Sequence, residues 1–391
     1  MAGQVFRWIA LAGFPASLTS PGATLSFSLV GAYGLYVIAV RKDLPADLRA
    51  VFRLMIACYL FLLAVDFLNG GGWSNLSTTG VNYLPLIAIV PFAHALRTLR
   101  IGPDILDRAM QLTVLLALAN TLIRILAFGE DRPGGPNLNS IPYAFILAVW
   151  CVFLFSRGLG TGRKDLLLAS AAALIPILLA ASKNASACLL AGLLVVAAGK
   201  AIRYAHRRQF LISLVAGALA LAASLYLTIS VRIHSMVSEI RVLYESGSVT
   251  ENSFGYRFEL AQAGWRAFLE DPFMGHGLAQ YMSVVRNHAM AGAPDLAQFG
   301  HVHNDYIAHM VAFGVFGLAF LAAFLVGSLW TVARSGDVAY RRAGFAFVAM
   351  LAIYMGADIA FNMDPITACM VLALGAVLSA PQQRGQSSAA D

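Results

Sequence analysis

Long apolar runs separated by short charged segments are the dominant feature of this 391-residue chain. A transmembrane helix needs about 20 largely apolar residues to cross the roughly 30 Å of hydrocarbon in a bilayer, and many of the runs approach that length. Only 12% of the residues are charged, whereas about a quarter are charged in a typical soluble domain. A water-soluble fold is therefore excluded. The chain is predicted to be an all-α polytopic membrane protein that forms a single membrane domain over residues 1–391.

The apolar runs predict about 12 transmembrane helices. Their ranges are 5–18, 24–40, 51–68, 81–96, 109–128, 141–156, 165–181, 185–199, 210–230, 306–330, 343–360 and 366–380. Only residues 19–23 separate the first two runs, and Pro15 and Pro21 would bend a helix there. The first two runs are therefore either two spans or one.

The basic residues favour one set of alternate connections between these runs. Residues 41–53 hold four Lys or Arg side chains and residues 200–208 hold four more, whereas residues 70–80 hold none. Because cytoplasmic loops are enriched in Lys and Arg, this pattern predicts a multi-pass protein with both termini in the cytoplasm. The formal charge of +7 lies mainly in these connections, so it does not indicate nucleic acid as a partner.

The longest connection, residues 231–305, lies between the ninth and tenth predicted spans, on the side opposite the cytoplasm. A connection of this length is usually functional, and it is predicted to contain amphipathic helices. The clearer helix has Ser253 as its N-cap and ends before Pro272, and a weaker pattern covers residues 232–244. One face of the clearer helix carries Phe254, Phe258, Ala261, Trp265 and Phe268. This helix is expected to lie at the membrane interface or to pack over the spans, and Gly275-His276-Gly277 is expected to form a turn.

The densest polar cluster is His301-Val302-His303-Asn304-Asp305-Tyr306, where the long loop re-enters the membrane. Asn304 or Asp305 would cap the tenth span. The two histidines would alternatively bind a metal, but no carboxylate-rich or cysteine set accompanies them and none of the four cysteines has CxxC spacing, so no metal is expected. In the third interpretation His303 is a base or orienting acceptor for a substrate hydroxyl. His301, Asn304 and Asp305 would then support it.

Three cations on the outer side, Lys183, Arg257 and Arg124, depart from the charge rule. Lys183 lies between two apolar spans, where snorkelling of its ammonium group to the headgroups is the simple explanation. Cations at such positions are otherwise functional hypotheses. Together on one face they would bind a diphosphate, because Arg presents a planar fork to phosphate oxygens and stabilises charge on a departing one. The chain has no DxD or ExD pair, so these cations would replace a metal ion.

Four segments resemble the O-antigen ligase and polymerase superfamily over roughly residues 178–325. They are Ser182-Lys183-Asn184-Ala185, the stretch from Tyr256-Arg257 to Trp265, Pro272-Phe273-Met274-Gly275-His276-Gly277, and His301 to Tyr306 followed by Gly314 and Gly317. The resemblance implies an inverting, metal-independent glycosyl transfer without a cofactor, from an undecaprenyl diphosphate-linked glycan, at the periplasmic face of the bacterial inner membrane. By motif match His303 is similar to the essential histidine and Arg257 to a diphosphate-contacting arginine. Lys183 departs from the family pattern, which more often has Arg there and so a bidentate fork.

Within this superfamily the favoured prediction is O-antigen ligase, with lipid A-core oligosaccharide as the acceptor and undecaprenyl diphosphate-linked O-antigen as the donor. The basis is that only one predicted outer connection, the periplasmic loop 231–305, is long. An O-antigen or exopolysaccharide polymerase is the nearest alternative. A transporter of a lipid-linked anion is the alternative from another class, since it would also need cations facing a cavity. It is less favoured because the sequence shows no convincing internal repeat.

Overall fold

The computed structural model describes residues 2–19, 22–42, 44–69, 72–201, 253–290 and 295–380. Over these residues the regular secondary structure is helical, without a β-strand. The helices are α1 (Ala2–Ala16), α2 (Gly22–Arg41), α3 (Ala46–Leu68), α4 (Gly72–Thr98), α5 (Pro103–Phe128), α6 (Ser140–Thr161), α7 (Lys164–Leu179), α8 (Lys183–Ala201), α10 (Ser253–Glu270), α11 (Tyr281–Asn287), α12 (Asp305–Ala333), α13 (Val338–Met355) and α14 (Asp364–Ser379). The prediction of an all-α fold is confirmed.

Each predicted span that lies within the described residues overlaps one of these helices. The predicted span 210–230 and the weaker helical pattern 232–244 lie outside the described residues. The first two apolar runs form two separate helices, α1 and α2. The eleventh span is displaced from its predicted range, because α13 begins at Val338, where the side chain of Asp337 accepts hydrogen bonds from two backbone N–H groups of the first turn.

Seven of the described helices are long and apolar enough to cross a membrane, namely α2, α3, α4, α5, α6, α12 and α13. The apolar helices α8 and α14 are shorter. Exposed leucine, isoleucine and phenylalanine side chains are frequent on α3 and α5. In a bilayer these outward faces would contact lipid, so the structure is that of a multi-pass membrane protein.

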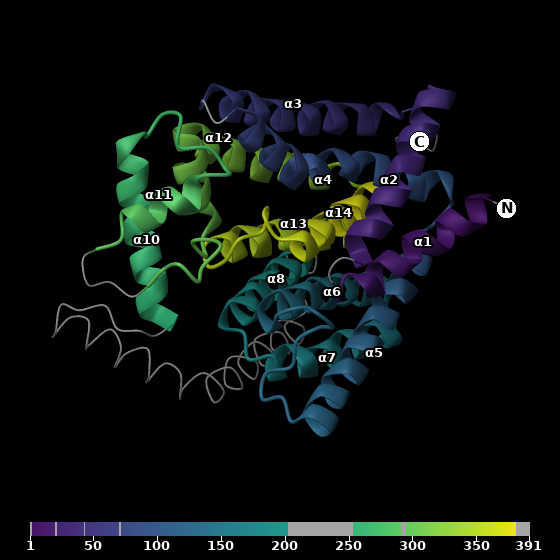
Figure 1. Ribbon diagram of the computed structural model, residues 1–391. Coiled ribbons are helices and arrows are strands. Elements are labelled where there is room, and N and C mark those ends of the chain that lie inside the picture. Colours follow the sequence, from purple (N-terminus) through teal and green to yellow (C-terminus); the bar gives the residue numbers. More distant parts are fainter. Residues whose placement is uncertain are drawn as a thin grey trace.

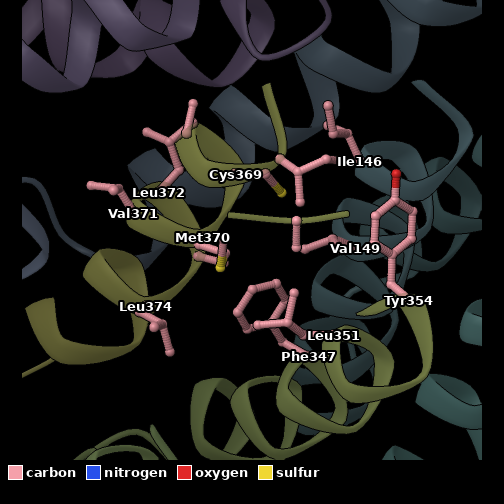
Figure 2. Close-up of a cluster of buried hydrophobic side chains, with 14 of the residues drawn as sticks. Ile146, Val149, Phe347, Leu351, Tyr354, Cys369, Met370, Val371, Leu372 and Leu374 are labelled. Carbon is pink, nitrogen blue, oxygen red and sulfur yellow. The ribbon is translucent and has the colours of Figure 1, made fainter. Parts of the chain in front are cut away.

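The core of the bundle is built around α14 and α6. Every residue of α14 after Asp364 is buried, and most of α6 is buried as well. Figure 2 shows side chains of α6, α13 and α14 meeting in this core, among them Val149, Phe347 and Met370. Helices that are apolar all round are the ones expected at the centre of a membrane bundle.

The connections predicted to be cytoplasmic meet at one end of the bundle. Arg97, at the end of α4, forms an ion pair with Asp47 of α3 at 2.7 Å. Arg157, near the end of α6, bridges Asp107 of α5 at 3.0 Å and Asp337 before α13 at 2.8 Å. These ion pairs link neighbouring connections that are rich in Lys and Arg and that are predicted to be cytoplasmic. The predicted alternation of the connections is therefore present in the fold.

Helices α10 and α11 lie at the opposite end of the bundle from α1 (Figure 1). The prediction that α10 begins at Ser253 and ends before Pro272 is confirmed. Ala263, Gly264 and Ala267 are buried together with Leu260 and Phe268, and Gly264 lies directly against Ile307 of α12. Trp265, expected on the packed side or at the interface, is 50% exposed. Small residues let two helices approach closely, which explains why α10 has a glycine at the point where it meets Ile307.

Helix α12 is broken at Gly314, whose φ of 63° and ψ of −148° lie outside the helical region. The segment after α10 hydrogen-bonds to the backbone groups freed by the break. His276 N–H donates to the carbonyl of Val311 and Gly277 N–H to that of Ala312, each at 2.8 Å. In the other direction, Val315 N–H donates to the carbonyl of Pro272 at 2.8 Å. Residues 272–277 are therefore docked on the broken helix.

The glycines of the two motifs permit this docking. Gly275 has a φ of 75°, and a Cβ atom there would lie 2.6 Å from backbone atoms of α12. A Cβ atom on Gly314 would overlap the backbone carbonyl of Phe273. A positive φ disfavours every residue with a side chain except, at times, Asn and Asp. The docked segment also fixes α10, because the His276 ring is hydrogen-bonded to the Ala267 carbonyl at 2.8 Å.

We expect Gly314→Ala to destabilise the protein by about 3 kcal/mol or more, since it combines an unfavourable φ with a clash against rigid backbone. Gly129→Ala is the matched control, because Gly129 also has a positive φ (64°) but open space around it; only about 1–2 kcal/mol is expected there. Thermal unfolding of the two purified variants in detergent measures the difference. Equal destabilisation would contradict the docking of residues 272–277 on α12.

Candidate functional site

The connection between α13 and α14, residues 356–363, holds the predicted site residues together. Its first three residues bind three side chains from two distant parts of the chain. The Gly356 carbonyl accepts from the side-chain amide of Asn304 at 2.9 Å, and the Ala357 carbonyl accepts from Nη1 of Arg257 at 3.0 Å. The carboxylate of the next residue, Asp358, lies 3.2 Å from Nδ1 of His303. The structure thus places Arg257 of α10 beside His303.

His303 is oriented by Asp358. The Asp358 side chain is 4% exposed, and its Oδ1 also accepts from the backbone N–H of Ile359 at 3.0 Å. An ionised carboxylate only accepts hydrogen bonds, so this contact favours the His303 tautomer in which Nδ1 donates to Asp358 and Nε2 is left to accept. The side chain of His303 is 19% exposed, so this nitrogen can receive a proton from a bound hydroxyl. The residue has a φ of 51°, an uncommon backbone conformation of the kind found at active sites.

His301 packs against His303, with ring centroids 4.1 Å apart, and its Nδ1 accepts from the backbone N–H of His303 at 3.3 Å. Burial, together with the neighbouring His303 ring, lowers the pKa of His301 to about 4. A base with a lowered pKa is neutral above that value, so His301 is uncharged near neutral pH. In this neutral form its Nδ1 can accept the hydrogen bond from the His303 backbone.

Three groups in this site could together bind a metal ion. One ligand atom each from His301, His303 and Asp358 lies within 4.8 Å of the others. Imidazole nitrogens and a carboxylate oxygen suit Zn²⁺ in chemistry. The sequence indicated no carboxylate-rich or cysteine set beside the two histidines, and the structure places one carboxylate there, that of Asp358, which is 55 residues away from His303 in the sequence. That no metal takes part stays a prediction.

Asn304 is the N-cap of α12, because its side-chain oxygen accepts from the N–H of Ile307 at 3.1 Å. The interpretation of this residue as a cap is confirmed, although its amide nitrogen also binds the Gly356 carbonyl. Asp305 is buried, and its carboxylate accepts a hydrogen bond from the backbone N–H of Ala360. Both residues thus attach the start of α12 to the connection 356–363.

Lys183 is the first residue of α8, which packs against α13, and it lies at the same height in the bundle as the connection 356–363. Cys188 of α8 donates to the carbonyl of Met350, and Gly199 contacts Arg342, so the helices are antiparallel and Lys183 is opposite the end of α13. Its ammonium group is exposed, without a hydrogen bond or ion pair to the residues that the structure describes. Arg124 is instead paired with Glu130 at 2.6 Å. The structure therefore brings Arg257 to His303, and leaves Arg124 in a pair of its own.

Two buried polar groups near this region were not singled out from the sequence. The amide nitrogen of Asn184, next to Lys183, and the hydroxyl of Tyr354 have no hydrogen-bond partner within the described part of the chain. Buried polar groups normally have partners, so these are places where a substrate or water can bind. Tyr354 lies in an apolar run, and only its position in the last turn of α13 could have indicated it.

We expect Asn304→Ala to destabilise the start of α12 by about 1–2 kcal/mol, because it removes the cap and the bond to Gly356. Asn304→Ser keeps the cap but is too short for that second bond, so about half of the loss is expected. Thermal unfolding in detergent measures both values. If Asn304→Ser were as stable as wild type and Asn304→Ala lost only the cap's contribution, the bond to Gly356 would not contribute to stability.

Comparison with known proteins agrees with this geometry. Residues 142–322 match a protein-family model described as O-antigen ligase. The match includes Lys183, Arg257 and the segment from His301 to Asp305, and it extends further toward the N-terminus than the motifs in the sequence indicate. No curated protein matches the chain. The match covers a little less than half of the chain. It supports the O-antigen ligase superfamily and a function in the processing of lipopolysaccharide or a related glycan, and it does not separate ligases from polymerases.

Proposed function

We propose that this protein is an O-antigen ligase, a glycosyltransferase of the bacterial inner membrane whose site faces the periplasm. It transfers O-antigen from undecaprenyl diphosphate to a hydroxyl of lipid A-core oligosaccharide. The observation that supports it most is the connection 356–363, where the Ala357 carbonyl binds Arg257 and the adjacent Asp358 binds His303. A cation for a diphosphate and an oriented base for a hydroxyl therefore lie side by side.

In the proposed reaction the acceptor hydroxyl gives its proton to Nε2 of His303 as its oxygen attacks the anomeric carbon of the donor. A new C–O bond forms while the C–O bond to the diphosphate breaks, and undecaprenyl diphosphate leaves with the electron pair. Attack from the face opposite the leaving group inverts the anomeric centre. Asp358 stabilises the imidazolium that forms, as a carboxylate partner does for a catalytic histidine.

Charge on the departing diphosphate is stabilised by cations. One N–H group of Arg257 is used by the Ala357 carbonyl, and the remaining donors of its guanidinium can bind phosphate oxygens. Lys183 adds a second positive charge, as a point charge without the bidentate fork. Arg124 would join them only if its pair with Glu130 opened. With cations in this role the transfer needs no metal ion.

We expect His303→Ala to abolish ligation, since a positioned base contributes about 10²- to 10⁴-fold to such a step. The measurement is the lipopolysaccharide banding pattern of a ligase-deficient strain that expresses the chain. His288→Ala is the matched control, because His288 lies in the same loop and also contacts a carboxylate, that of Glu270 at 2.9 Å. Wild type and His288→Ala should restore the ladder, and Asp358→Asn should give a weaker one.

A normal ladder from His303→Ala would show that the proposed mechanism is wrong. If well-expressed wild type restored no ladder, the protein would have a different activity within the superfamily. Longer lipid-linked chains in a polymerase-deficient strain would then identify a polymerase. Transfer by the purified protein in the presence of EDTA tests the metal-independent step, and loss of activity that zinc restores would assign His301, His303 and Asp358 as ligands instead.

We expect Arg257→Gln to weaken binding of undecaprenyl diphosphate by about 10- to 100-fold, since a hydrogen bond to a charged group contributes about 1.5–3 kcal/mol. Arg257→Lys keeps the charge but not the fork, so an intermediate loss is expected. Binding of the lipid to purified protein in detergent is the measurement, with Arg124→Gln beside it. If Arg124→Gln lost as much affinity as Arg257→Gln, the ion pair with Glu130 would not keep Arg124 out of the site.

A further inference from the structure

A groove of about 660 Å³ opens between α1 and α5, far from the site described above. Its walls are largely apolar and include Leu11 of α1 with Ile105 and Leu112 of α5. Trp8, which is 70% exposed, stands at the groove. Tryptophan is enriched where a membrane protein crosses the boundary between headgroups and hydrocarbon, so the groove faces that boundary.

Two arginines, Arg7 of α1 and Arg108 of α5, line the same groove. Neither forms an ion pair or a side-chain hydrogen bond with the residues that the structure describes. Asp104, one turn before Arg108, is within ion-pair distance of Arg157 and Arg163 instead. The two guanidinium groups therefore keep their charge and their hydrogen-bond donors available at the groove.

Both arginines lie toward the end of the bundle where the predicted cytoplasmic connections meet. Gly3, near the start of α1, lies close to Leu99 in the connection between α4 and α5. Asp107, next to Arg108, belongs to the ion-pair network of Arg157. The groove therefore has its cations toward this end of the bundle, and its apolar walls extend from there along α1 and α5.

We infer that this groove binds an anionic phospholipid of the cytoplasmic leaflet. The headgroup phosphate lies between Arg7 and Arg108, and an acyl chain follows the apolar walls past Leu11 and Leu112. Paired guanidinium groups suit a phosphate, and the cytoplasmic leaflet is the one rich in anionic lipid. The apolar length of the groove favours a lipid over a free phosphate, which would leave those walls uncovered. The exposed charges disfavour a second copy of the chain, whose matching groove would also be positive.

The test uses purified full-length protein in nanodiscs that contain phosphatidylglycerol and phosphatidylcholine, with native mass spectrometry of the retained lipid. Arg7→Gln combined with Arg108→Gln is expected to lower retained phosphatidylglycerol about tenfold or more, since each basic residue near an anionic surface adds substantially to lipid affinity. Arg41→Gln combined with Arg53→Gln is the matched control. It removes the same charge from exposed arginines at the same end of the bundle but outside the groove, and little change is expected.

A second variant separates a lipid from a soluble anion. Ala12→Phe fills the apolar part of the groove from an exposed position and leaves both arginines in place; retained phosphatidylglycerol should fall here as well. The proposal would be overturned if the double arginine variant retained as much phosphatidylglycerol as wild type. It would also be overturned if the control variant lost as much phosphatidylglycerol as the double arginine variant. A third contrary result would be that glycerol phosphate stabilises the wild-type protein as strongly as phosphatidylglycerol does. A dimer that dissociates in the double variant, without lipid in either form, would assign the groove to a second copy.

Discussion

The break in α12 is the constraint on which the outer end of the molecule depends. Inside a bilayer an unpaired backbone group costs several kcal/mol, so the carbonyls of Val311 and Ala312 need donors that their own helix cannot supply. The segment 272–277 supplies these donors and receives a bond from Val315 in return. The polar loop that contains α10 is thereby attached to a membrane helix by backbone hydrogen bonds. Arg257 owes its position to this attachment.

The connection 356–363 completes the site from the other side. Its backbone and the Asp358 carboxylate contact Arg257, His303 and Asn304. Because the same few residues hold the cation and the histidine, a shift of the connection would move both together. The cation and the histidine are therefore held next to one another through a single short connection. Such pre-organisation matters for a transfer reaction, since reacting groups displaced by about 1 Å can lose much of the rate.

The sequence predicted the spans well because bilayer thickness sets their length, and the charge of the connections predicted which of them share an end. Ser253, Pro272 and the glycines 275–277 likewise marked the boundaries of α10 and the turn after it. The pairing of His303 with Asp358 could not be predicted, since it depends on how α12 packs against α13. The packed face of α10 was also beyond prediction. A small-residue stripe has a weak hydrophobic signal, and only the close approach to Ile307 makes it favourable.

The arginines of this fold are held in two different ways. At the end that holds the predicted cytoplasmic connections, Arg97 and Arg157 are neutralised by aspartates of neighbouring helices. These two pairs fix the helix ends and cancel the charge of the arginines in them, whereas Arg7 and Arg108 at the same end line the groove between α1 and α5. At the outer end, Arg257 is held by a backbone carbonyl instead. A carbonyl positions a guanidinium without cancelling its charge, so this arrangement keeps a full positive charge beside His303. In the proposed transfer the anionic donor needs such a charge, and an aspartate in place of the Ala357 carbonyl would remove it.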